Sequence, residues 1–523
     1  MFPDRFNLAD YLLHHNLDEG RGDKVALRWR GEEHTYTQLA DASSRLASAF
    51  VDLGLRQEER VLLALSDRPE FSHAWFATLE AGGVFAMVNP LLGEEAFADY
   101  LEYTRARIAV IDAELAPMFE RLKQRSPHLK AVVVAGGESS SEKPELAGKQ
   151  QFAMLDLIAA SPPGAGRADT HKHDIAGWLF TSGSTGRPKA AVHLHEDFAF
   201  NIEKYAKSVL GIREDDVTAG VPKLFFGYAT GTNLMFPFAV GATTVLFSER
   251  STPETIFDLI ERERPTILTS VPTMIGKMLA LEKTGATRDL SSLRLVLSAG
   301  EKLPETLQRQ WLDRCGVEIL DGIGSAELFH IYISNRPGEV RPGSLGQAVP
   351  GYDCRVVDET GFELPAGETG RLHVRGESAA ICYWQAHEAS KETFRGDLVI
   401  TGDLFRMDND EYYYYEGRAD ELLKVAGKFV APHEVEECLL THEHVAQAAV
   451  IGWKDAEDLV KPRAFVVAGP GQAPDEAFGA LLQEWVRTHL SPHKYPRVVT
   501  FLEDLPKNDR GKVDRRSLSQ QPD

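Results

Sequence analysis

Residues 181–189 read TSGSTGRPK and bring glycines, hydroxyl side chains and two cations into one short stretch. Such residues let backbone N–H and side-chain O–H groups converge on an anion, so the stretch could hold phosphate. It is not a Walker-A loop, because two residues separate Gly186 from Lys189 and Ala190 takes the place of the required Ser or Thr. A phosphate-binding loop and an ordinary solvated loop therefore both fit these residues.

Three further stretches carry residues that could act on a nucleotide. In ILDGIGSAELFH (319–330) a glycine turn precedes Glu327, which could bind Mg²⁺ through its carboxylate or cap a helix. Asp403, in the triplet TGD, could accept hydrogen bonds from both hydroxyls of a ribose or cap a turn. Lys512 lies in the basic stretch LPKNDRGKVDRRSL (505–518), where a lysine is usually just solvated. Each stretch has two interpretations when it is taken alone.

The elements that must position these residues alternate along most of the chain. Strand-length apolar runs such as VLLALS (61–66) and LRLVLSAG (293–300) alternate with helix-like segments such as TPETIFDLIERER (252–264). This alternation predicts an α/β fold with mainly parallel sheets, which bind ligands at the carboxyl ends of their strands. From about residue 345 the pattern predicts antiparallel strands, and beyond Arg418 it predicts a small α+β domain.

The composition limits the class of protein. The 523 residues exceed what one hydrophobic core usually organises, so two or more domains are expected. A net charge of −21 argues against nucleic acid and membranes as partners, since both call for a basic surface. Four dispersed cysteines without a CxxC pair argue against a zinc site or a disulfide framework. No secretory signal or membrane-length apolar run is visible, so the cytoplasm is the expected location.

Together and in this order, the motifs resemble the acyl-adenylate-forming superfamily of acyl- and aryl-CoA ligases, peptide-synthetase adenylation domains and luciferases. The resemblance spans essentially the whole chain and rests on TSGSTGRPK, SAGEKLP, DGIGSAE, TGD, GRADELLKVAGKFVAPHEVE and PKNDRGK. It implies an α/β N-terminal domain (residues 1–418) with mainly parallel sheets plus a small β-barrel, and a smaller mobile α+β C-terminal domain (419–523). It also implies a two-step reaction that forms an acyl-AMP from a carboxylate and ATP and then transfers the acyl group to a thiol.

The resemblance also implies roles for individual residues. Glu327 would bind Mg²⁺, and Lys512 would bridge the carboxylate and the α-phosphate. Asp403 and Arg418 would bind the ribose, and Asp420 would be the hinge about which the small domain rotates. The other residues implied to contact ATP or AMP are Thr181, Ser182, Gly183, Ser184, Thr185, Gly186, Lys189, Ser298, Ala299, Gly300, Glu301, Asp321, Gly322, Ile323 and Gly324. The residues implied to line the coenzyme A tunnel are Lys424, Gly427 and Lys428.

The stretch KLFFGYATGTN (223–233) bears on the identity of the acid. Amino-acid-activating relatives place an Asp in this region to pair with the substrate amine, and here Gly227 stands at that position. An α-amino acid would leave its ammonium buried without a partner, so amino acids are disfavoured. The expected pocket is aromatic and apolar and suits a flat aryl ring. Its residues are Phe226, Gly227, Tyr228, Gly231, Ser270, Val271, Pro272, Ala299, Ile323 and His330.

The same segments look most like the benzoate-CoA ligase branch, which includes ligases for anthranilate (2-aminobenzoate). Gly227 is smaller than the Ala associated with plain benzoate enzymes, which could make room for a ring substituent. His330 could bond an ortho or para group, or make a structural hydrogen bond within the pocket wall. The expected partners are a small aryl carboxylate, ATP with Mg²⁺, and coenzyme A, with the protein a monomer or homodimer. The alternative is a freestanding adenylation enzyme that loads aryl groups onto a carrier protein.

Two residues depart from the pattern of the relatives. Ala326 replaces a Thr whose hydroxyl contacts phosphate or metal, so either Ser325 compensates or the α-phosphate loses one hydrogen bond worth about 1 kcal/mol. Ala190 replaces a Gly, which costs nothing at a negative φ and causes strain at a positive φ.

Overall fold

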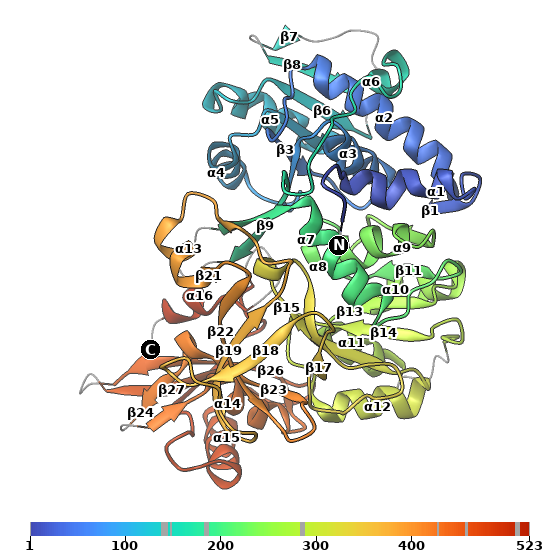
Figure 1. The fold of residues 1–523 in the computed structure, drawn as a ribbon. Coiled ribbons are helices and arrows are strands. Elements are labelled where there is room, and N and C mark those ends of the chain that lie inside the picture. Colours follow the sequence, from blue (N-terminus) through green and yellow to red (C-terminus); the bar gives the residue numbers. More distant parts are fainter. Residues whose placement is uncertain are drawn as a thin grey trace. The chain divides into compact units, whose positions relative to one another are not determined.

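The protein is described by a computed structural model, and Figure 1 follows its chain from end to end. The described residues are 2–136, 145–146, 149–182, 188–282, 288–425, 428–455, 459–507 and 513–521. The chain divides into two compact units, Met1–Cys354 with Val374–Ile400 and Arg355–His373 with Thr401–Asp523. The sequence predicts a different boundary, after Arg418, between a large N-terminal domain and a mobile C-terminal domain. That boundary is defined by domain motion and stays a prediction.

A nine-stranded sheet in the first unit has the order β17-β16-β15-β14-β13-β11-β12-β1-β2. The neighbouring strands β15, β14, β13, β11, β12 and β1 are parallel to one another. Strands β2, β16 and β17 pair antiparallel at the two edges. The strands are β1 (Val25–Trp29), β2 (Glu32–Thr35), β11 (Val217–Gly220), β12 (Thr243–Leu246), β13 (Ile267–Ser270), β14 (Leu295–Ser298), β15 (Ile319–Gly324), β16 (Ile331–Ser334) and β17 (Gln347–Ala348).

Amphipathic helices cover this sheet. They are α10 (Pro253–Glu263), α11 (Pro272–Glu282) and α12 (Glu305–Cys315). In α10 the buried residues Ile256, Phe257 and Ile260 recur at helical spacing and belong to the same core cluster as Val296 of β14. The helix begins where the Thr252 hydroxyl accepts a hydrogen bond from the backbone N–H of Thr255 (3.2 Å). The predicted alternation of buried strand and amphipathic helix is therefore confirmed here.

The second nine-stranded sheet of this unit has the order β20-β10-β9-β4-β3-β5-β6-β8-β7. Strands β9, β4, β3, β5, β6 and β8 are parallel neighbours, and β10, β20 and β7 pair antiparallel. The strands are β3 (Arg60–Ala64), β4 (Val84–Met87), β5 (Ile108–Asp112), β6 (Ala131–Ala135), β7 (Glu145–Leu146), β8 (Lys149–Ala153), β9 (Ile175–Ser182), β10 (Pro188–Leu194) and β20 (Cys382–Tyr383). Its helices are α2 (Tyr36–Asp52), α3 (Pro69–Glu80), α4 (Glu94–Thr104), α5 (Ala116–Leu122), α6 (Met154–Ala160) and α7 (His195–Asn201). The predicted α/β class with mainly parallel sheets is confirmed.

The stretch expected to form antiparallel strands contains a five-stranded sheet of order β18-β19-β22-β21, with β23 beside β22. Its strands are β18 (Asp353–Val357), β19 (Thr369–Arg375), β21 (Phe394–Arg395), β22 (Leu398–Met407) and β23 (Tyr413–Arg418). Strand β22 is antiparallel to both β21 and β23. The sheet lies where a small β-barrel is expected, but among the described residues its strand order does not close into a barrel.

The C-terminal part of the second unit has the predicted α+β character. Its three-stranded sheet is β26 (Val445–Lys454), β27 (Val460–Ala468) and β28 (Val498–Phe501), and its helices are α14 (Pro432–Leu440), α15 (Glu476–His489) and α16 (Arg515–Ser519). A short hairpin, β24 (Leu423–Val425) with β25 (Lys428–Val430), precedes them. Among the described residues, no helix has both the length and the apolar character needed to cross a membrane.

Candidate active site

Three buried polar side chains form a row at the carboxyl ends of parallel strands in the first unit. Ser270 of β13 pairs in register with Ser298 of β14, which pairs with Asp321 of β15. All three are at most 3% exposed, and burial raises the pKa of Asp321 to about 8. Strand ends of this kind are where α/β sheets bind ligands. The structure thus brings three of the predicted site residues together at one sheet edge.

The segments that follow these strands carry other residues predicted to surround the nucleotide. Gly300, just beyond β14, has a φ of +88°, a conformation that favours glycine. Glu301 is already engaged, because its Oε2 accepts hydrogen bonds from the backbone N (3.1 Å) and Oγ1 (2.7 Å) of Thr273 in α11. Residues 322–324 complete β15. Glu301 therefore ties the end of β14 to α11, and its contact with ATP stays a prediction.

The predicted phosphate-binding stretch connects two antiparallel strands. Thr181 and Ser182 end β9, and Lys189 of β10 lies opposite Thr181 in the register of the pair. Because β9 is parallel to β4, the stretch leaves the carboxyl end of a parallel strand, as the sequence predicts. Four residues predicted to contact phosphate lie outside the described residues: Gly183, Ser184, Thr185 and Gly186.

Ala190, the first departure from the family pattern, causes no backbone strain. It lies in the extended strand β10, and its φ is not positive. Its methyl group is fully buried against Val84 and Trp178, and its carbonyl accepts a hydrogen bond from the Trp384 backbone N–H (2.9 Å). Of the two alternatives open from the sequence, the one without cost is therefore correct.

Glu327 lies in the short helix η6 (Ala326–Leu328), which follows β15. Its Oε1 accepts a hydrogen bond of 2.5 Å from the Tyr383 hydroxyl, and its backbone carbonyl accepts one of 2.9 Å from the Ala380 N–H. The Lys189 ammonium lies over the Tyr383 ring, 5.3 Å from its centroid. Tyr383 therefore connects the predicted Mg²⁺ ligand with the predicted phosphate-binding lysine.

A buried histidine–aspartate pair supports the same turn from inside the first unit. His193 Nε2 donates a hydrogen bond to the Ala326 carbonyl (2.7 Å), so this nitrogen carries a proton. His193 Nδ1 lies 3.0 Å from Asp197 Oδ2, which also accepts a hydrogen bond from the Leu194 N–H (3.0 Å). Burial raises the pKa of Asp197. The backbone next to Glu327 is thus anchored by a side chain that sequence reasoning did not single out.

Ala326, the second departure, turns its methyl group toward an apolar cluster. It packs against buried Ala191, Ala380 and Tyr383. The neighbouring Ser325 has a buried hydroxyl for which the described part of the chain offers no hydrogen-bond partner. Because a buried polar atom without a partner costs free energy, this hydroxyl is suited to meet a ligand oxygen. The observation favours Ser325 as the replacement for the missing Thr hydroxyl.

The residues present fit Mg²⁺ better than a metal that needs a full protein cage. Within the described ranges, no group of three or more His, Cys, Asp and Glu side chains could hold a metal ion. Mg²⁺ is usually bound by one or two carboxylates and completes its shell with phosphate oxygens and water. The single, partly exposed carboxylate of Glu327 next to the predicted phosphate stretch meets that requirement.

His330 lies at the centre of an aromatic box. Its ring centroid is 4.7 Å from Phe236, 5.3 Å from Tyr228, 5.4 Å from Phe329 and 5.7 Å from Tyr205. Burial lowers the pKa of His330 to about 4, so the ring is neutral at pH 7. Its Nε2 lies 3.0 Å from the Tyr228 carbonyl, which fixes the proton on Nε2 and leaves Nδ1 as an acceptor. Nδ1 is buried and has no hydrogen-bond partner among the described residues.

The structural alternative therefore holds for Nε2, and a bond from Nδ1 to a ring substituent stays a prediction. The Tyr228 hydroxyl is likewise buried and without a hydrogen-bond partner in the described ranges. Tyr228 lies in α8 (Gly227–Thr230), which continues into the π-helical turn η5 (Gly231–Met235), a geometry frequent at functional sites. Of the other predicted pocket residues, Phe226 precedes α8, Val271 and Pro272 follow β13, Ala299 follows β14, and Ile323 lies in β15. The predicted pocket thus draws on the α8–η5 segment and on three neighbouring strand ends.

A methyl group at Gly231 is expected to disrupt this pocket. A Cβ there would lie 2.6 Å from His330 Nε2, so Gly231→Ala must displace the imidazole and break its bond to Tyr228. We expect the KM for the aryl acid to rise about tenfold and stability to fall by about 1–3 kcal/mol. The matched control is Gly276→Ala in α11, outside the predicted pocket, whose Cβ would meet Leu307 at an ordinary 3.8 Å. Steady-state kinetics and thermal unfolding of both variants check the prediction, and equal effects would contradict it.

The residues predicted to bind ribose lie together in the second unit. Asp403 pairs with Arg418 across β22 and β23, and Arg418 Nη1 lies 3.5 Å from Asp403 Oδ1. The Arg418 guanidinium also donates to both carboxylate oxygens of Asp420 (3.1 and 3.3 Å). Burial by itself lowers the pKa of Arg418, but Asp420 and Asp403 raise it above its ordinary value. A Cβ at Gly402 would lie 2.6 Å from Arg418 Nη2, so a larger residue there would displace the guanidinium from its place beside Asp403.

Lys424 and Lys428, predicted to lie near coenzyme A, are both exposed on the β24–β25 hairpin. Lys428 also lies close enough to His493 to lower its pKa, an effect second to desolvation. Gly427 and the catalytic candidate Lys512 lie outside the described residues. Their roles stay predictions.

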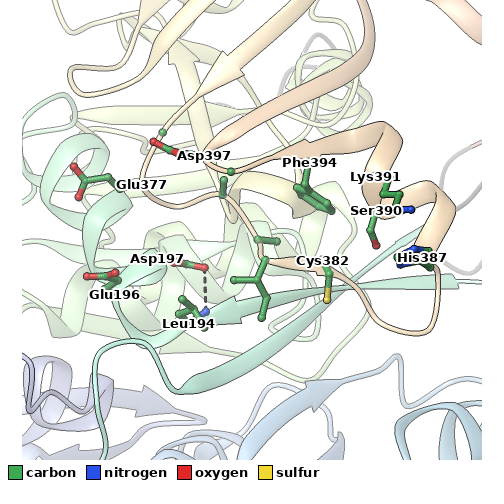
Figure 2. A pocket seen from close by; sticks show the side chains of 15 residues that line it. Leu194, Glu196, Asp197, Glu377, Cys382, His387, Ser390, Lys391, Phe394 and Asp397 are labelled. Atoms are coloured by element: carbon green, nitrogen blue, oxygen red, sulfur yellow. Dashed lines mark hydrogen bonds between the residues drawn. The ribbon is translucent and has the colours of Figure 1, made fainter.

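Sequence reasoning missed the side chains that support Glu327. Tyr383 belongs to no recognisable motif, and its partner is 56 positions away in the sequence. His193 and Asp197 stand four positions apart at the junction of β10 and α7, a spacing that could have suggested a buried pair. A hollow of about 630 Å³ lies beside this region, and Asp197, Cys382 and Phe394 are among the residues that line it. Figure 2 shows these side chains. None of the predicted site residues lines this hollow.

The first unit combines polar residues at strand ends, a short helical turn that carries the Glu327 carboxylate, and an aromatic box around His330. On a largely parallel α/β sheet, these features are typical of a nucleotide-dependent enzyme. The chain matches the family described as AMP-binding enzyme over residues 14–384 and its C-terminal domain over residues 434–512. It belongs to the AMP-binding enzyme family.

Relatives agree with the predicted branch of that family. The chain is 42% identical to a benzoate–CoA ligase of Thauera aromatica, and the match covers 99% of this chain and 96% of the relative. A solved anthranilate CoA ligase, AuaEII in complex with anthranoyl-AMP, is 38% identical with a TM-score of 0.91 and coverage of 99% and 97%. A solved benzoate CoA ligase from Burkholderia xenovorans LB400 is 37% identical with a TM-score of 0.87 and coverage of 98% and 100%. The predicted resemblance to the adenylate-forming superfamily and its benzoate- and anthranilate-CoA ligase branch is confirmed.

Proposed function

We propose that this chain is an ATP-dependent aryl-CoA ligase for a benzoate-type acid. The observation that carries the proposal is the segment 327–330, which holds a carboxylate at one end and the centre of an aromatic box at the other. The Glu327 carboxylate is assigned to the phosphates and His330 to the aryl ring. Their closeness in sequence suits a reaction that joins an aryl carboxylate to a nucleotide. The names of the similar proteins support the same reaction.

The first half-reaction joins the acid to ATP. A carboxylate oxygen of the acid attacks the α-phosphorus, the bond from this phosphorus to the bridging oxygen breaks, and pyrophosphate leaves. Negative charge gathers on the phosphoryl oxygens in the transition state, so cations and hydrogen-bond donors lower the barrier. Lys512, Lys189 and the Ser325 hydroxyl are the groups assigned to that task. Glu327 would hold Mg²⁺, which would supply positive charge to the phosphate oxygens.

The second half-reaction transfers the aryl group to sulfur. The thiol of coenzyme A, on losing its proton, attacks the acyl carbon, the carbon–oxygen bond to the phosphate breaks, and AMP leaves. Exposed Lys424 and Lys428 suit the phosphates of coenzyme A, and Asp420 is the proposed hinge. A carrier protein presents pantetheine without these nucleotide phosphates. Turnover with free coenzyme A therefore separates the ligase from the carrier-loading alternative.

The pocket also bears on the ring substituent. His330 Nδ1 is a buried acceptor, and the Tyr228 hydroxyl beside it is a buried donor and acceptor, and neither has a hydrogen-bond partner in the described part of the chain. Benzoate itself offers nothing to these atoms, whereas a ring N–H or O–H satisfies one of them. The favoured substrate is therefore a benzoate that carries an amino or hydroxyl group, such as 2-aminobenzoate.

A pyrophosphate-release screen tests the activity and the substituent together. Benzoate and its 2-, 3- and 4-amino and hydroxy derivatives are supplied with ATP, Mg²⁺ and coenzyme A. We expect one substituted acid to exceed benzoate about 10- to 100-fold in kcat/KM, the equivalent of about 1–3 kcal/mol for one buried polar contact. His330→Phe should remove most of that preference. Pyrophosphate release from none of these acids would refute the ligase, and a preference for benzoate would refute the assigned substituent.

The remaining partner assignments are part of the same proposal. The net charge of −21 does not suit nucleic acid or an anionic membrane surface as a partner. A cytoplasmic location and a monomeric or homodimeric state stay predictions. Size-exclusion chromatography with light scattering decides between the two oligomeric states.

A further inference from the structure

Tyr383 contacts both charged groups assigned to the metal–phosphate side of the site. Its hydroxyl donates the 2.5 Å hydrogen bond to Glu327 Oε1, and its ring lies under the ammonium of Lys189. The described part of the chain offers Glu327 no other ion pair or side-chain hydrogen bond. The Tyr383 hydroxyl thus binds one carboxylate oxygen of Glu327. That bond also sets the direction in which the second oxygen, Oε2, points.

The phenol itself is held rigidly. Tyr383 is 8% exposed, and it lies in β20, which pairs with β10 opposite Ala191. Its backbone N–H donates to Ser390 Oγ (2.9 Å), and its ring centroid lies 5.0 Å from that of Phe394. Ser390 comes from α13 (His387–Thr393), and both Ser390 and Phe394 line the hollow, as labelled in Figure 2. These contacts hold the Tyr383 ring in one position, and therefore also hold its hydroxyl group in place.

We propose that Tyr383 is a positioning residue that pre-orients the Glu327 carboxylate for the metal–nucleotide complex. A glutamate on a short helical turn has several side-chain rotamers, and ordering them upon metal binding costs entropy. The Tyr383 hydrogen bond selects one rotamer before the nucleotide arrives, and the ring keeps Lys189 on the same side. Side chains whose geometry must be kept for function are commonly locked by such neighbours. The inference rests on the proposed function, because that proposal assigns Glu327 to Mg²⁺.

Tyr383→Phe tests the inference because it removes the hydroxyl and keeps the ring. We expect the half-saturating Mg²⁺ concentration for pyrophosphate release to rise about tenfold, the equivalent of one hydrogen bond to a charged group. The second readout is binding of Mn²⁺ with a non-hydrolysable α,β-methylene ATP, followed by electron paramagnetic resonance, where the same rise is expected. Thioester formation from supplied aryl-AMP should be unchanged, since that step needs no metal-bound pyrophosphate.

Two tyrosines provide matched controls. Tyr103 donates to the Trp384 carbonyl (2.6 Å), one residue from Tyr383. Tyr36 donates to the carbonyl of Ala242 (2.6 Å), the residue before β12 of the other sheet. Tyr103→Phe and Tyr36→Phe should leave the Mn²⁺–nucleotide affinity unchanged. A Tyr103→Phe shift as large as that of Tyr383→Phe would show general weakening of the β10–β20 edge and would overturn the proposal. An unchanged or lowered metal requirement in Tyr383→Phe would also overturn it.

A double-mutant cycle with Glu327→Gln separates this inference from the proposed function. If Tyr383 acts through Glu327, Tyr383→Phe should change the Mn²⁺–nucleotide affinity little once Glu327 is already Gln. Additive effects in the cycle would overturn the positioning role. If the wild type binds Mn²⁺–nucleotide and the cycle behaves as expected, but no aryl acid releases pyrophosphate, then the proposed substrate fails and the positioning role stands.

Discussion

Lys512→Ala is expected to abolish aryl-AMP formation while leaving thioester formation from supplied aryl-AMP within a few-fold of the wild type. The lysine ammonium would meet the carboxylate and the α-phosphate where negative charge increases in the first transition state. Removal of such a charge-stabilising group typically costs about 10²- to 10³-fold in rate. The second half-reaction has a neutral thioester as its product and, by the family resemblance, uses a different orientation of the small domain.

Pyrophosphate exchange and coenzyme A consumption measure the two half-reactions separately. The matched control is Lys507→Ala, which removes the same charge from an exposed lysine of the same C-terminal stretch. Lys507 forms an isolated β-bridge with Val513, so the control also reports any damage to the local backbone. Equal loss of both half-reactions in Lys512→Ala, or equal loss in Lys507→Ala, would contradict the assigned role.

The sequence was sufficient for those parts of the fold and site that depend on local patterns. Alternation of buried strands and amphipathic helices is a local property, and α10 and β14 form where their spacing predicts. Ser298 and Asp321 could be placed at strand ends because each closes an apolar run. Parallel strands then bring such ends together, so a local pattern also predicts a shared site.

The parts that could not be predicted depend on contacts between distant segments. The Tyr383–Glu327 bond spans 56 positions and the His193–Ala326 bond spans 133. Neither periodicity nor turn chemistry specifies which loop meets which strand over such separations. The structural role of His330 could not be predicted from sequence either, because only the contact between Nε2 and the Tyr228 carbonyl reveals it. A contact of Nδ1 with a ligand stays a prediction.

Ala190 shows how a departure from a family pattern is resolved by backbone conformation. A glycine-to-alanine change near a phosphate-binding stretch suggests strain, but the residue lies in an extended strand with its methyl group in a core cluster. The nearby positive φ of Phe329 (68°) is the opposite case, since a bulky residue there is strained. The strained position falls between Glu327 and His330, where strain is often retained for function.

His193→Leu is expected to lower the free energy of unfolding by about 3 kcal/mol. The substitution removes the imidazole from both of its partners at once, since the Ala326 carbonyl loses its donor and the Asp197 carboxyl loses the Nδ1 contact. The His193 and Asp197 side chains are 0% and 3% exposed, so water cannot replace either contact, and an unpaired buried polar group costs about 1–3 kcal/mol or more when charged. The pKa of Asp197 is already raised by burial, so the carboxyl, left with only the Leu194 N–H as a donor, would be protonated more readily. The deficit should therefore shrink as the pH falls.

Urea unfolding at pH 5 and pH 8 measures this loss and its pH dependence. His173→Leu is the control, because His173 lies 2.7 Å from a Glu196 carboxylate oxygen but has a side chain that is 55% exposed. Exposed pairs contribute about 0–1 kcal/mol, so the control should unfold nearly as the wild type does. A loss in His193→Leu no larger than in His173→Leu would show that the buried pair does not anchor the turn. A clear loss in the first variant alone, with a raised Mg²⁺ requirement, would show that the Ala326 carbonyl must be held for Glu327 to keep its place.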